Sequence, residues 1–201
     1  MEATTGRQEA RGPGRPSTGA RERVLEAGLE TLLEEGYAGL TYARVAVRAG
    51  ENKSLISYYF CSKQGLVGAV SELVGDRITA GVLVEIEGSE TVGELVEGMV
   101  TGLWNVMDAD QRIARLYFDL SAVSVVDEDV RRSLHLVKDR WREVISGYLA
   151  VAGVPRHRVP AAATFLVAGV EGLAIERLEG YEPERLEEAS KLFIRSAALA
   201  L

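Results

Sequence analysis

The chain has 201 residues, of which 47% are hydrophobic and 26% are charged, the composition of an ordinary globular protein of one or two domains. Its formal net charge of −7 excludes a protein that binds nucleic acid through its overall charge. The charge is unevenly distributed: residues 1–70 carry nine Lys/Arg and eight Asp/Glu, for +1, whereas residues 71–201 carry fourteen and twenty-two, for −8. Any contact with DNA is therefore expected at the front of the chain.

The single cysteine and the lack of a signal-peptide pattern further limit the expected chemistry and location of the protein. Cys61 is the only cysteine, which excludes an internal disulfide and a cysteine-based metal cage, and we expect neither a metal nor a cofactor. Cys61 is expected to pack as a small residue, with a redox sensor as the alternative. The first residues lack the apolar stretch of a signal peptide, and no apolar run reaches the length of a bilayer. A cytoplasmic protein without a membrane segment is expected.

The chain begins with a segment of arm-like composition. Residues 1–18 are rich in Gly, Pro, Thr and Arg without periodicity, which predicts disorder. Arg11 and Arg15 could enter a minor groove, as the basic arms of some DNA-binding proteins do, or belong to a plain tail.

The next segments predict short helices with recognisable ends. Apolar residues recur at helical spacing, and capping residues stand at the expected starts. The first predicted helix covers residues 21–35 and ends at Gly36. The second covers 41–48 and is capped by Thr41, a turn follows at Ala49-Gly50, and the third covers 52–59 and is capped by Asn52.

Helical periodicity continues to the C-terminus. No segment alternates convincingly as a strand, so the predicted fold class is all-α with about nine helices. The remaining predicted helices are 63–86 capped by Ser62, 91–107 with a capping box at Thr91, one around 113–124, one from 127 that ends at Gly153 and Pro155, 160–179, and 183 to the C-terminus.

Two short helices joined by a glycine turn, the second polar and aromatic, indicate a helix-turn-helix motif. In this motif the second helix enters the major groove, while flanking residues hold phosphates. Over residues 20–67 the sequence resembles the N-terminal domain of the tetracycline-repressor (TetR) family. The resemblance rests on Val24-Leu25-Glu26-Ala27, Glu35-Gly36-Tyr37, Leu40-Thr41, Val45-Ala46, Arg48-Ala49-Gly50, Lys53, Tyr58-Tyr59-Phe60 and Ser62-Lys63.

This resemblance implies a domain organisation and a function. It implies a three-helix DNA-binding domain over 19–65 and a larger helical domain over 66–201 that binds a small molecule and forms a homodimer. The expected function is a ligand-responsive transcriptional regulator. We expect a repressor that binds a palindromic double-stranded operator and is released by a small, mainly apolar molecule, which moves the 63–86 helix.

The candidate DNA contacts lie in and around the second helix of the motif. Hydroxyl and ammonium groups near its end suit phosphate oxygens, and residues near its start are expected to face base edges. As alternatives, its tyrosines could pack in the core and its lysines could be ordinary solvated charges. The candidates are Thr41, Arg44, Lys53, Ser54, Leu55, Ser57, Tyr58, Tyr59 and Lys63.

Three residues depart from the family pattern and bear on the operator sequence. Glu51 stands where the family usually has an apolar residue, Leu55 where a small polar residue is frequent, and Ser57 where tyrosine is usual. The Glu51 carboxylate could stabilise the start of the helix that follows it, and Leu55 could contact a thymine methyl group.

The back half carries the candidate ligand site and dimer face. A bundle rich in Trp, Tyr and Met with scattered polar groups is typical of ligand cavities, although each such residue alone could simply be core. The ligand candidates are Met99, Leu103, Trp104, Met107, Tyr117, Phe118, Ser121, Leu134, His135, Lys138 and Trp141. Small residues on the last two helices permit close approach. The dimer candidates are Phe165, Leu166, Gly169, Gly172, Leu173 and Phe193.

Two other classes of function compete with a regulator. An enzyme is not expected, because His135 and His157 are far apart and no nucleophile elbow, zinc-protease pair or phosphate-binding loop occurs. The second is a helical small-molecule-binding or adaptor protein that has weak or lost DNA binding, which Glu51 and the acidic total favour. A mobility-shift assay on the DNA upstream of the gene distinguishes it from a repressor.

Overall fold

The computed structural model describes residues 19–201 and folds them into nine helices. Residues 1–18, the expected arm with Arg11 and Arg15, lie outside the described residues. The helices are α1 (Ala20–Gly39), α2 (Tyr42–Ala49), α3 (Lys53–Phe60), α4 (Lys63–Ile86), α5 (Val92–Ala109), α6 (Gln111–Ser124), α7 (Glu128–Val151), α8 (Val159–Leu178) and α9 (Pro183–Ala200). The described part of the chain contains no strand, which confirms the all-α prediction.

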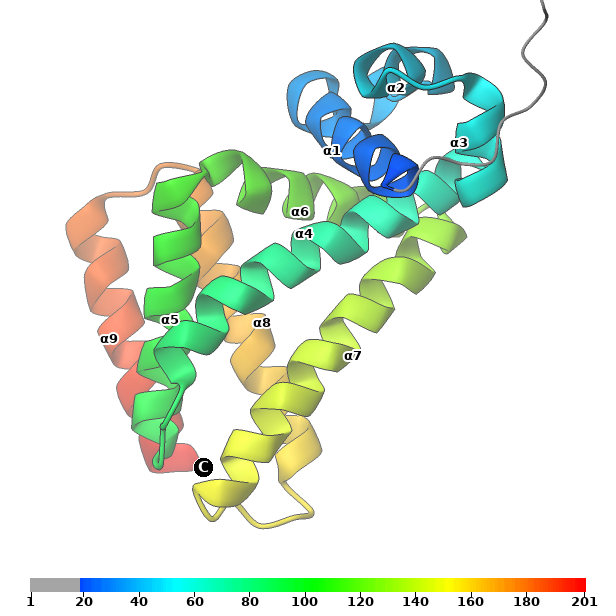
Figure 1. The fold of residues 1–201 in the computed structure, drawn as a ribbon. Helices are drawn as coiled ribbons and strands as arrows, with labels where there is room; N and C mark the ends of the chain where they lie inside the picture. Colours follow the sequence, from blue (N-terminus) through cyan, green and yellow to red (C-terminus); the bar gives the residue numbers. More distant parts are fainter. Residues whose placement is uncertain (1–18) are drawn as a thin grey trace, which may run out of the picture.

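The long helix α4 joins the two ends of the molecule. Figure 1 shows α1, α2 and α3 grouped around one end of α4, while α5, α8 and α9 lie toward its other end. Along its length α4 packs against α5 and α7, and α6 lies against α1 and α4. Helix α4 therefore packs against both groups of helices.

Helix starts follow the capping residues seen in the sequence. The Asn52 side chain accepts a hydrogen bond from the Leu55 backbone N–H at 2.8 Å, and Thr41 and Ser62 cap α2 and α4 in the same way. Thr91 and Glu94 form the predicted capping box. Since each cap satisfies backbone donors that a helix start leaves free, these short polar residues fix where the helices begin.

Glycines set two of the bends among helices α1, α2 and α3. Gly50 adopts φ 66° and ψ 30°, the left-handed conformation that forms the turn between α2 and α3. Gly36 adopts φ 68° and interrupts α1 where the sequence predicts its end, but one further turn continues to Gly39. The break therefore occurs at the predicted residue, although the helix bounds extend beyond it.

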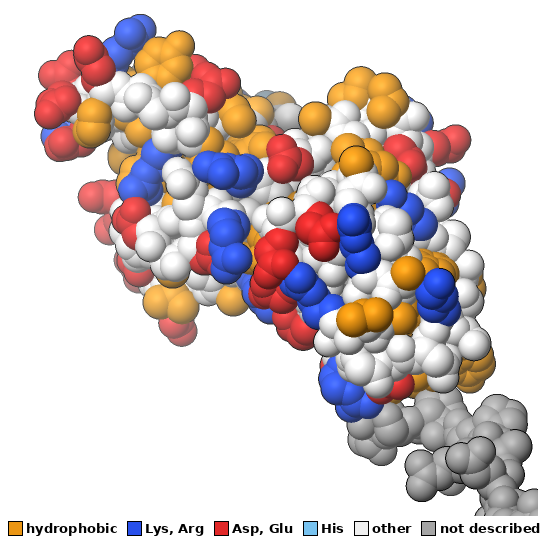
Figure 2. All heavy atoms as spheres, turned by 90° about the horizontal axis from the view of Figure 1, so that it is seen from above, with side chains coloured by type: hydrophobic (Ala, Val, Ile, Leu, Met, Phe, Trp, Pro, Cys, Tyr) orange, Lys and Arg blue, Asp and Glu red, His pale blue; other side chains and the backbone are white. Residues whose placement is uncertain are grey.

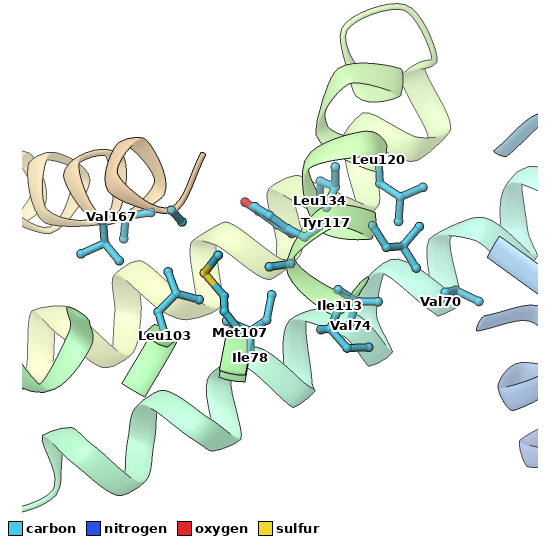
Figure 3. Close-up of a cluster of buried hydrophobic side chains, with 14 of the residues drawn as sticks. Val70, Val74, Ile78, Leu103, Met107, Ile113, Tyr117, Leu120, Leu134 and Val167 are labelled. Atoms are coloured by element: carbon cyan, nitrogen blue, oxygen red, sulfur yellow. The ribbon is translucent and has the colours of Figure 1, made fainter. Parts of the chain in front are cut away.

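One hydrophobic core runs through both ends of the molecule. Figure 3 shows side chains from α4, α5, α6, α7 and α8 meeting around Tyr117, Ile78 and Met107. In the group formed by α1, α2 and α3, Ile56 and Phe60 are buried, as their helical spacing predicts. Leu66 and Val70 on α4 are also fully buried and lie next to Gly28 of α1.

Helix α8 differs from the expectation that no apolar run reaches bilayer length. Its 20 residues have a mean hydropathy of 1.5 over the best window, enough for a membrane span by length and composition. The core helix of a soluble protein can pass the same test, and here Leu166 and Ala174 lie in the protein core. The high hydropathy comes from a helix that is apolar on more than its core-facing side.

Candidate DNA interface and ligand cavity

Helix α3 presents a polar, exposed face at the end of the molecule. Lys53, Ser54 and Ser57 are exposed, and Tyr58 is 70% exposed. The opposite face carries the buried Ile56 and places the helix against α1 and α4. An exposed row of hydroxyl and ammonium groups on the second helix of a helix-turn-helix is suited to a DNA groove.

The two adjacent tyrosines of α3 have different environments. Tyr59 is half-buried and packs against the core, whereas Tyr58 points outward, with the two ring centroids 5.3 Å apart. Leu55 is also half-buried. Packing therefore explains the half-buried position of Tyr59, and Tyr58 has the more accessible hydroxyl group of the pair.

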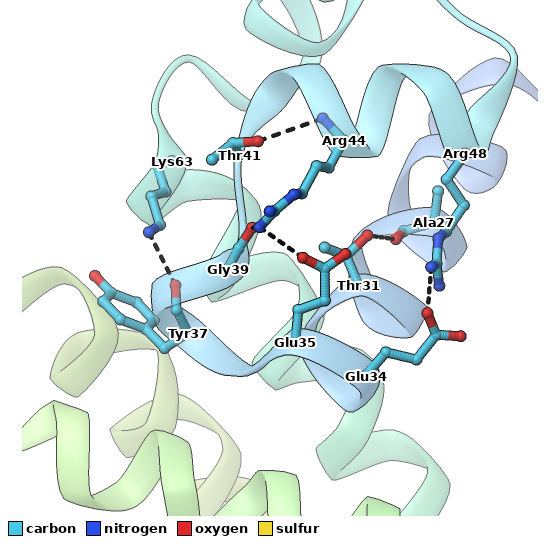
Figure 4. A network of polar contacts seen from close by, with 10 residues as sticks. All are labelled: Ala27, Thr31, Glu34, Glu35, Tyr37, Gly39, Thr41, Arg44, Arg48 and Lys63. Atoms are coloured by element: carbon cyan, nitrogen blue, oxygen red, sulfur yellow. Dashed lines mark hydrogen bonds and ion pairs between the residues drawn. The ribbon is translucent and has the colours of Figure 1, made fainter.

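Lys63, the first residue of α4, is held by α1. Its Nζ donates a hydrogen bond to the Tyr37 carbonyl at 2.9 Å and lies 4.5 Å from the centre of the Tyr37 ring. Figure 4 shows the two residues facing each other. The predicted phosphate contact thus has a second role, because the same ammonium joins α4 to α1.

The arginines of α2 are paired with acids on α1. Arg44 contacts the Glu35 carboxylate at 2.6 Å and donates to the Gly39 carbonyl at 2.8 Å, while Arg48 pairs with Glu34 (Figure 4). Residues 19–65 carry six Lys/Arg and six Glu, a net charge of zero. Figure 2 accordingly shows basic and acidic side chains next to one another on the face seen from above. Both arginines are therefore already paired within the protein, including Arg44, one of the predicted DNA contacts.

Glu51 has a structural partner. Its carboxylate pairs with Arg23 of α1 and is only 15% exposed, and Asn52, not Glu51, caps α3. The ion pair ties the turn between α2 and α3 to α1. Glu51 therefore places little free negative charge toward DNA, which removes one argument for an adaptor that has lost DNA binding.

A cavity of about 80 Å³ lies in the second group of helices. Helices α4, α5, α6, α7 and α8 all contribute to its wall, which is mainly apolar. The lining residues are Ile78, Thr79, Val82, Leu83, Ile86, Met99, Leu103, Ala114, Tyr117, Phe118, Trp141, Val144, Ile145, Val167, Val170, Glu171 and Ala174.

The structure divides the predicted ligand residues into two groups. Met99, Leu103, Tyr117, Phe118 and Trp141 line the cavity together. The other predicted residues lie outside the cavity wall. Met107 and Leu134 are buried in the core, and His135 is exposed to solvent. The Arg177 guanidinium lies over the Trp104 ring, the Ser121 hydroxyl donates to the Tyr117 carbonyl, and Lys138 pairs with Glu171.

The polar groups of the cavity wall are bonded to one another or to backbone. The Trp141 indole N–H donates to Thr79 Oγ1 at 2.7 Å, and Thr79 in turn donates to the Gly75 carbonyl at 2.7 Å. The Tyr117 hydroxyl donates to the Glu171 carboxylate. Burial, and next the Glu171 charge, raise the pKa of Tyr117 above its usual range, so its hydroxyl stays protonated.

Sequence reasoning missed the wall residues that come from α4 and α8, and also Ala114, Val144 and Ile145. Ile78 and Val82 have the spacing of ordinary core residues, and Glu171 follows an apolar run in which nothing marks it as inward-facing. An acidic residue within the apolar α8 sequence is the one signal that could have drawn attention to it.

The predicted dimer face is partly used within the protomer. Leu166 is fully buried in the core, and a side chain at Gly169 would collide with Phe193 of α9. Leu166 therefore offers no free surface, and Gly169 and Phe193 are partly covered because α8 and α9 pack on each other. Phe165 stays 47% exposed, and Gly172 has open space above it. The large apolar side chains that α8 and α9 leave exposed are Phe165, Leu192 and Leu199.

Known proteins share both parts of this architecture. The sequence profile of "Bacterial regulatory proteins, tetR family" matches residues 24–70. The HTH-type transcriptional regulator BetI 1 of Chromohalobacter salexigens is 29% identical over 154 residues, 76% of each chain. A putative transcriptional regulator from Streptomyces coelicolor A3(2) superposes with a TM-score of 0.74 at 22% identity, over 90% of this chain and 98% of that one. A putative regulator from Saccharomonospora viridis, solved in complex with choline, gives 0.64 at 18%, over 88% and 94%.

The fold and the exposed recognition helix define a DNA-binding transcriptional regulator of the helix-turn-helix class, not an enzyme. Residues 24–70 match the tetR family of regulators, and the chain is similar in sequence and fold to regulators of that family. Regulators of this family bind operator DNA and small-molecule effectors.

Proposed function

We propose that this protein is a homodimeric repressor that leaves a palindromic operator when a small molecule enters the cavity. The observation that carries the proposal is the course of α4. Its first turn contacts α1 through Lys63, and its last turns line the cavity with Ile78, Val82 and Ile86. An occupant that displaces these side chains would also displace the helix on which the DNA-binding domain rests.

A second connection supports coupling between the two regions. The Tyr37 hydroxyl of α1 donates to Asp127 at 3.1 Å, and Asp127 also caps α7 through the Asp129 and Val130 backbone N–H groups. Helix α7 carries the cavity residues Trp141, Val144 and Ile145. A shift of α7 would therefore act on α1 through Tyr37, while α4 acts through Lys63.

The geometry of DNA sets how large the change must be. Two recognition helices have to lie roughly 34–36 Å apart to reach successive major grooves. A ligand changes DNA affinity only by its different affinity for the DNA-bound and free forms. A displacement of a few ångströms in α4 would therefore be enough to lose one half-site.

A filled cavity provides a test that needs no identified effector. Ala174 is fully buried in the cavity wall, so Ala174→Phe would occupy the space with a side chain. The proposal expects operator affinity to fall at least about tenfold, about 1.4 kcal/mol, while thermal unfolding remains cooperative. Ala150→Phe on the exposed side of α7 is the control and should bind normally. A cavity-filled protein with unchanged operator affinity would contradict the coupling.

The dimer is supported by the apolar side chains that α8 and α9 leave exposed. Leu192 is 60% and Leu199 is 90% exposed, and a second copy would cover both in a four-helix arrangement. Gly172→Arg should break the dimer without harming the protomer, because nothing lies near that position. Gly147→Arg, also in open space on α7, is the control. Sedimentation of the unaltered protein as a monomer at micromolar concentration would refute the dimer.

A further inference from the structure

The start of the recognition helix α3 has little packing of its own. The two buried residues of this helix, Ile56 and Phe60, lie at its middle and at its end. Lys53 and Ser54 at its start are exposed, and Leu55 is half-buried. The core therefore holds the second part of α3, whereas its first turn, which carries the predicted contacts with base edges, depends on the turn that precedes it.

An ion pair fixes this preceding turn. Glu51 stands between α2 and α3, directly before the Asn52 cap, and its backbone N–H donates to the Ala46 carbonyl of α2 at 3.0 Å. Its side chain pairs with Arg23, which lies in the first turn of α1. Because the Glu51 side chain is only 15% exposed, solvent screens this pair less than it screens a fully exposed one.

The same turn of α1 also contacts the other end of α3. The Arg21 guanidinium lies over the Phe60 ring, 5.5 Å from its centre. Figure 1 shows the start of α1 next to α3. The first turn of α1 thus contacts the last residue of the recognition helix through Arg21, and the turn before that helix through Arg23.

We propose that the ion pair between Glu51 and Arg23 positions the first turn of α3 and thereby contributes to operator specificity. The inference rests on the proposed repressor function, in which α3 reads the operator. Hydrogen bonds to base edges require a fixed helix, because they weaken steeply when donor and acceptor are misaligned. The attraction between cations and phosphates is independent of sequence. Loss of the pair therefore reduces the preference for the operator more than the affinity for DNA in general.

A purely electrostatic role of the two charges would have a different signature. Glu51→Gln removes a negative charge near the start of α3, and Arg23→Gln removes a positive one. If these charges acted on DNA only through their fields, the two variants would change affinity in opposite directions, and by the same factor on every sequence. A positioning role instead lowers the operator preference in both variants.

Affinities of the full chain for two duplexes test the inference. One duplex carries the DNA upstream of the gene and the other the same bases in scrambled order, each measured by fluorescence anisotropy at physiological salt. The ratio of the two affinities should fall about three- to fivefold per half-site in Glu51→Gln and in Arg23→Gln, as expected for a partly exposed ion pair. An unchanged ratio in either variant would overturn the positioning role.

Further variants separate positioning from a loss of structure. Partial unfolding would lower both affinities by the same factor and leave their ratio unchanged. Arg23→Lys keeps a cation opposite Glu51 and should retain more than half of the preference. The double variant Arg23→Gln with Glu51→Gln should lose no more than either single variant, because both changes remove the same pair. Additive losses, or an equal loss in Arg23→Lys and Arg23→Gln, would overturn the inference.

A matched control breaks an ion pair elsewhere in the protein. Asp108 of α5 pairs with Arg177 of α8 at 2.5 Å, so this pair also joins two helices, but neither of them contacts α3. Asp108→Asn should keep the full ratio of affinities. A fall in this variant as large as that in Glu51→Gln would show that any lost ion pair has the same effect, and would overturn the specific role of Glu51.

The unaltered protein separates this inference from the function on which it rests. If it binds both duplexes equally, the proposed operator recognition fails, and the inference fails with it. If it prefers the upstream duplex and the variants keep that preference, the regulator stands and only the role of the ion pair is refuted.

Discussion

The recognition helix and the cavity wall each contain a tyrosine, but the two tyrosines have opposite environments. Tyr58 on α3 is 70% exposed, so its hydroxyl is open to a partner. Tyr117 in the cavity wall is 3% exposed, and its hydroxyl is committed to Glu171. A buried donor must be satisfied inside the protein, whereas an exposed donor can exchange water for a partner. The proposed DNA site on α3 therefore offers free donors, whereas the cavity offers an apolar, aromatic wall.

The two tyrosines provide the comparison with the largest expected effect. Tyr117→Ala should lower the free energy of unfolding by about 3–5 kcal/mol, because it removes a buried ring. Tyr58→Ala should change stability by less than about 0.5 kcal/mol. Chemical denaturation of both variants measures the difference. Similar losses in the two variants would show that Tyr58 is a packing residue.

The same exposed tyrosine should matter for DNA. Tyr58→Ala should weaken operator binding by up to about fivefold per half-site, because one hydrogen bond to a phosphate is worth about 1 kcal/mol. Tyr181→Ala, an exposed tyrosine between α8 and α9, is the control. Fluorescence anisotropy with a labelled duplex gives both affinities, and equal binding by the two variants would contradict the role of Tyr58.

Releasing a paired arginine should strengthen DNA binding modestly. Glu35→Gln removes the carboxylate that holds Arg44, so Arg44 becomes available to phosphate. Because exposed ion pairs are worth at most about 1 kcal/mol, we expect up to about fivefold tighter binding and a steeper salt dependence. Glu22→Gln on the exposed side of α1 should have little effect. A Glu35→Gln variant that binds more weakly would show that this pair orients Arg44 for DNA.

The smallest expected effect lies at the junction of the two regions and depends on pH. Backbone N–H groups of α7, chiefly that of Val130, and the Tyr37 hydroxyl lower the pKa of Asp127. A carboxylate with a lowered folded-state pKa stabilises the protein above its unfolded pKa of about 4, and this contribution disappears as the pH falls through the folded value. Asp127→Asn should therefore lose less stability than the unaltered protein between pH 6 and pH 3, with Glu128→Gln as the control. An identical pH dependence would contradict this account.

Local signals explain why the DNA-binding end could be predicted almost residue by residue. Thr41, Asn52 and Ser62 act on the next turn of chain, and Gly50 acts on its own backbone, so each can be recognised without the rest of the fold. Glu51 is the exception, since its partner Arg23 is 28 residues away in sequence.

The cavity depends on packing between distant segments, which periodicity does not reveal. Tyr117 and Glu171 are 54 residues apart, and Lys138 and Glu171 are 33 apart. The 3.6-residue period gives the inward face of each helix but not which inward side chains leave space between them. For the same reason the sequence did not show that Phe193 covers Gly169.

The central claim is that α3 reads a specific operator, and affinity for two duplexes tests it most directly. One duplex would carry the DNA upstream of the protein's own gene, and the other the same bases in scrambled order, both at physiological salt. The account predicts that the upstream duplex binds at least about a thousandfold tighter. It also predicts that Lys53→Ala weakens binding to both duplexes, while Leu55→Ala changes their ratio. Equal affinity of the unaltered protein for the two duplexes would contradict the claim.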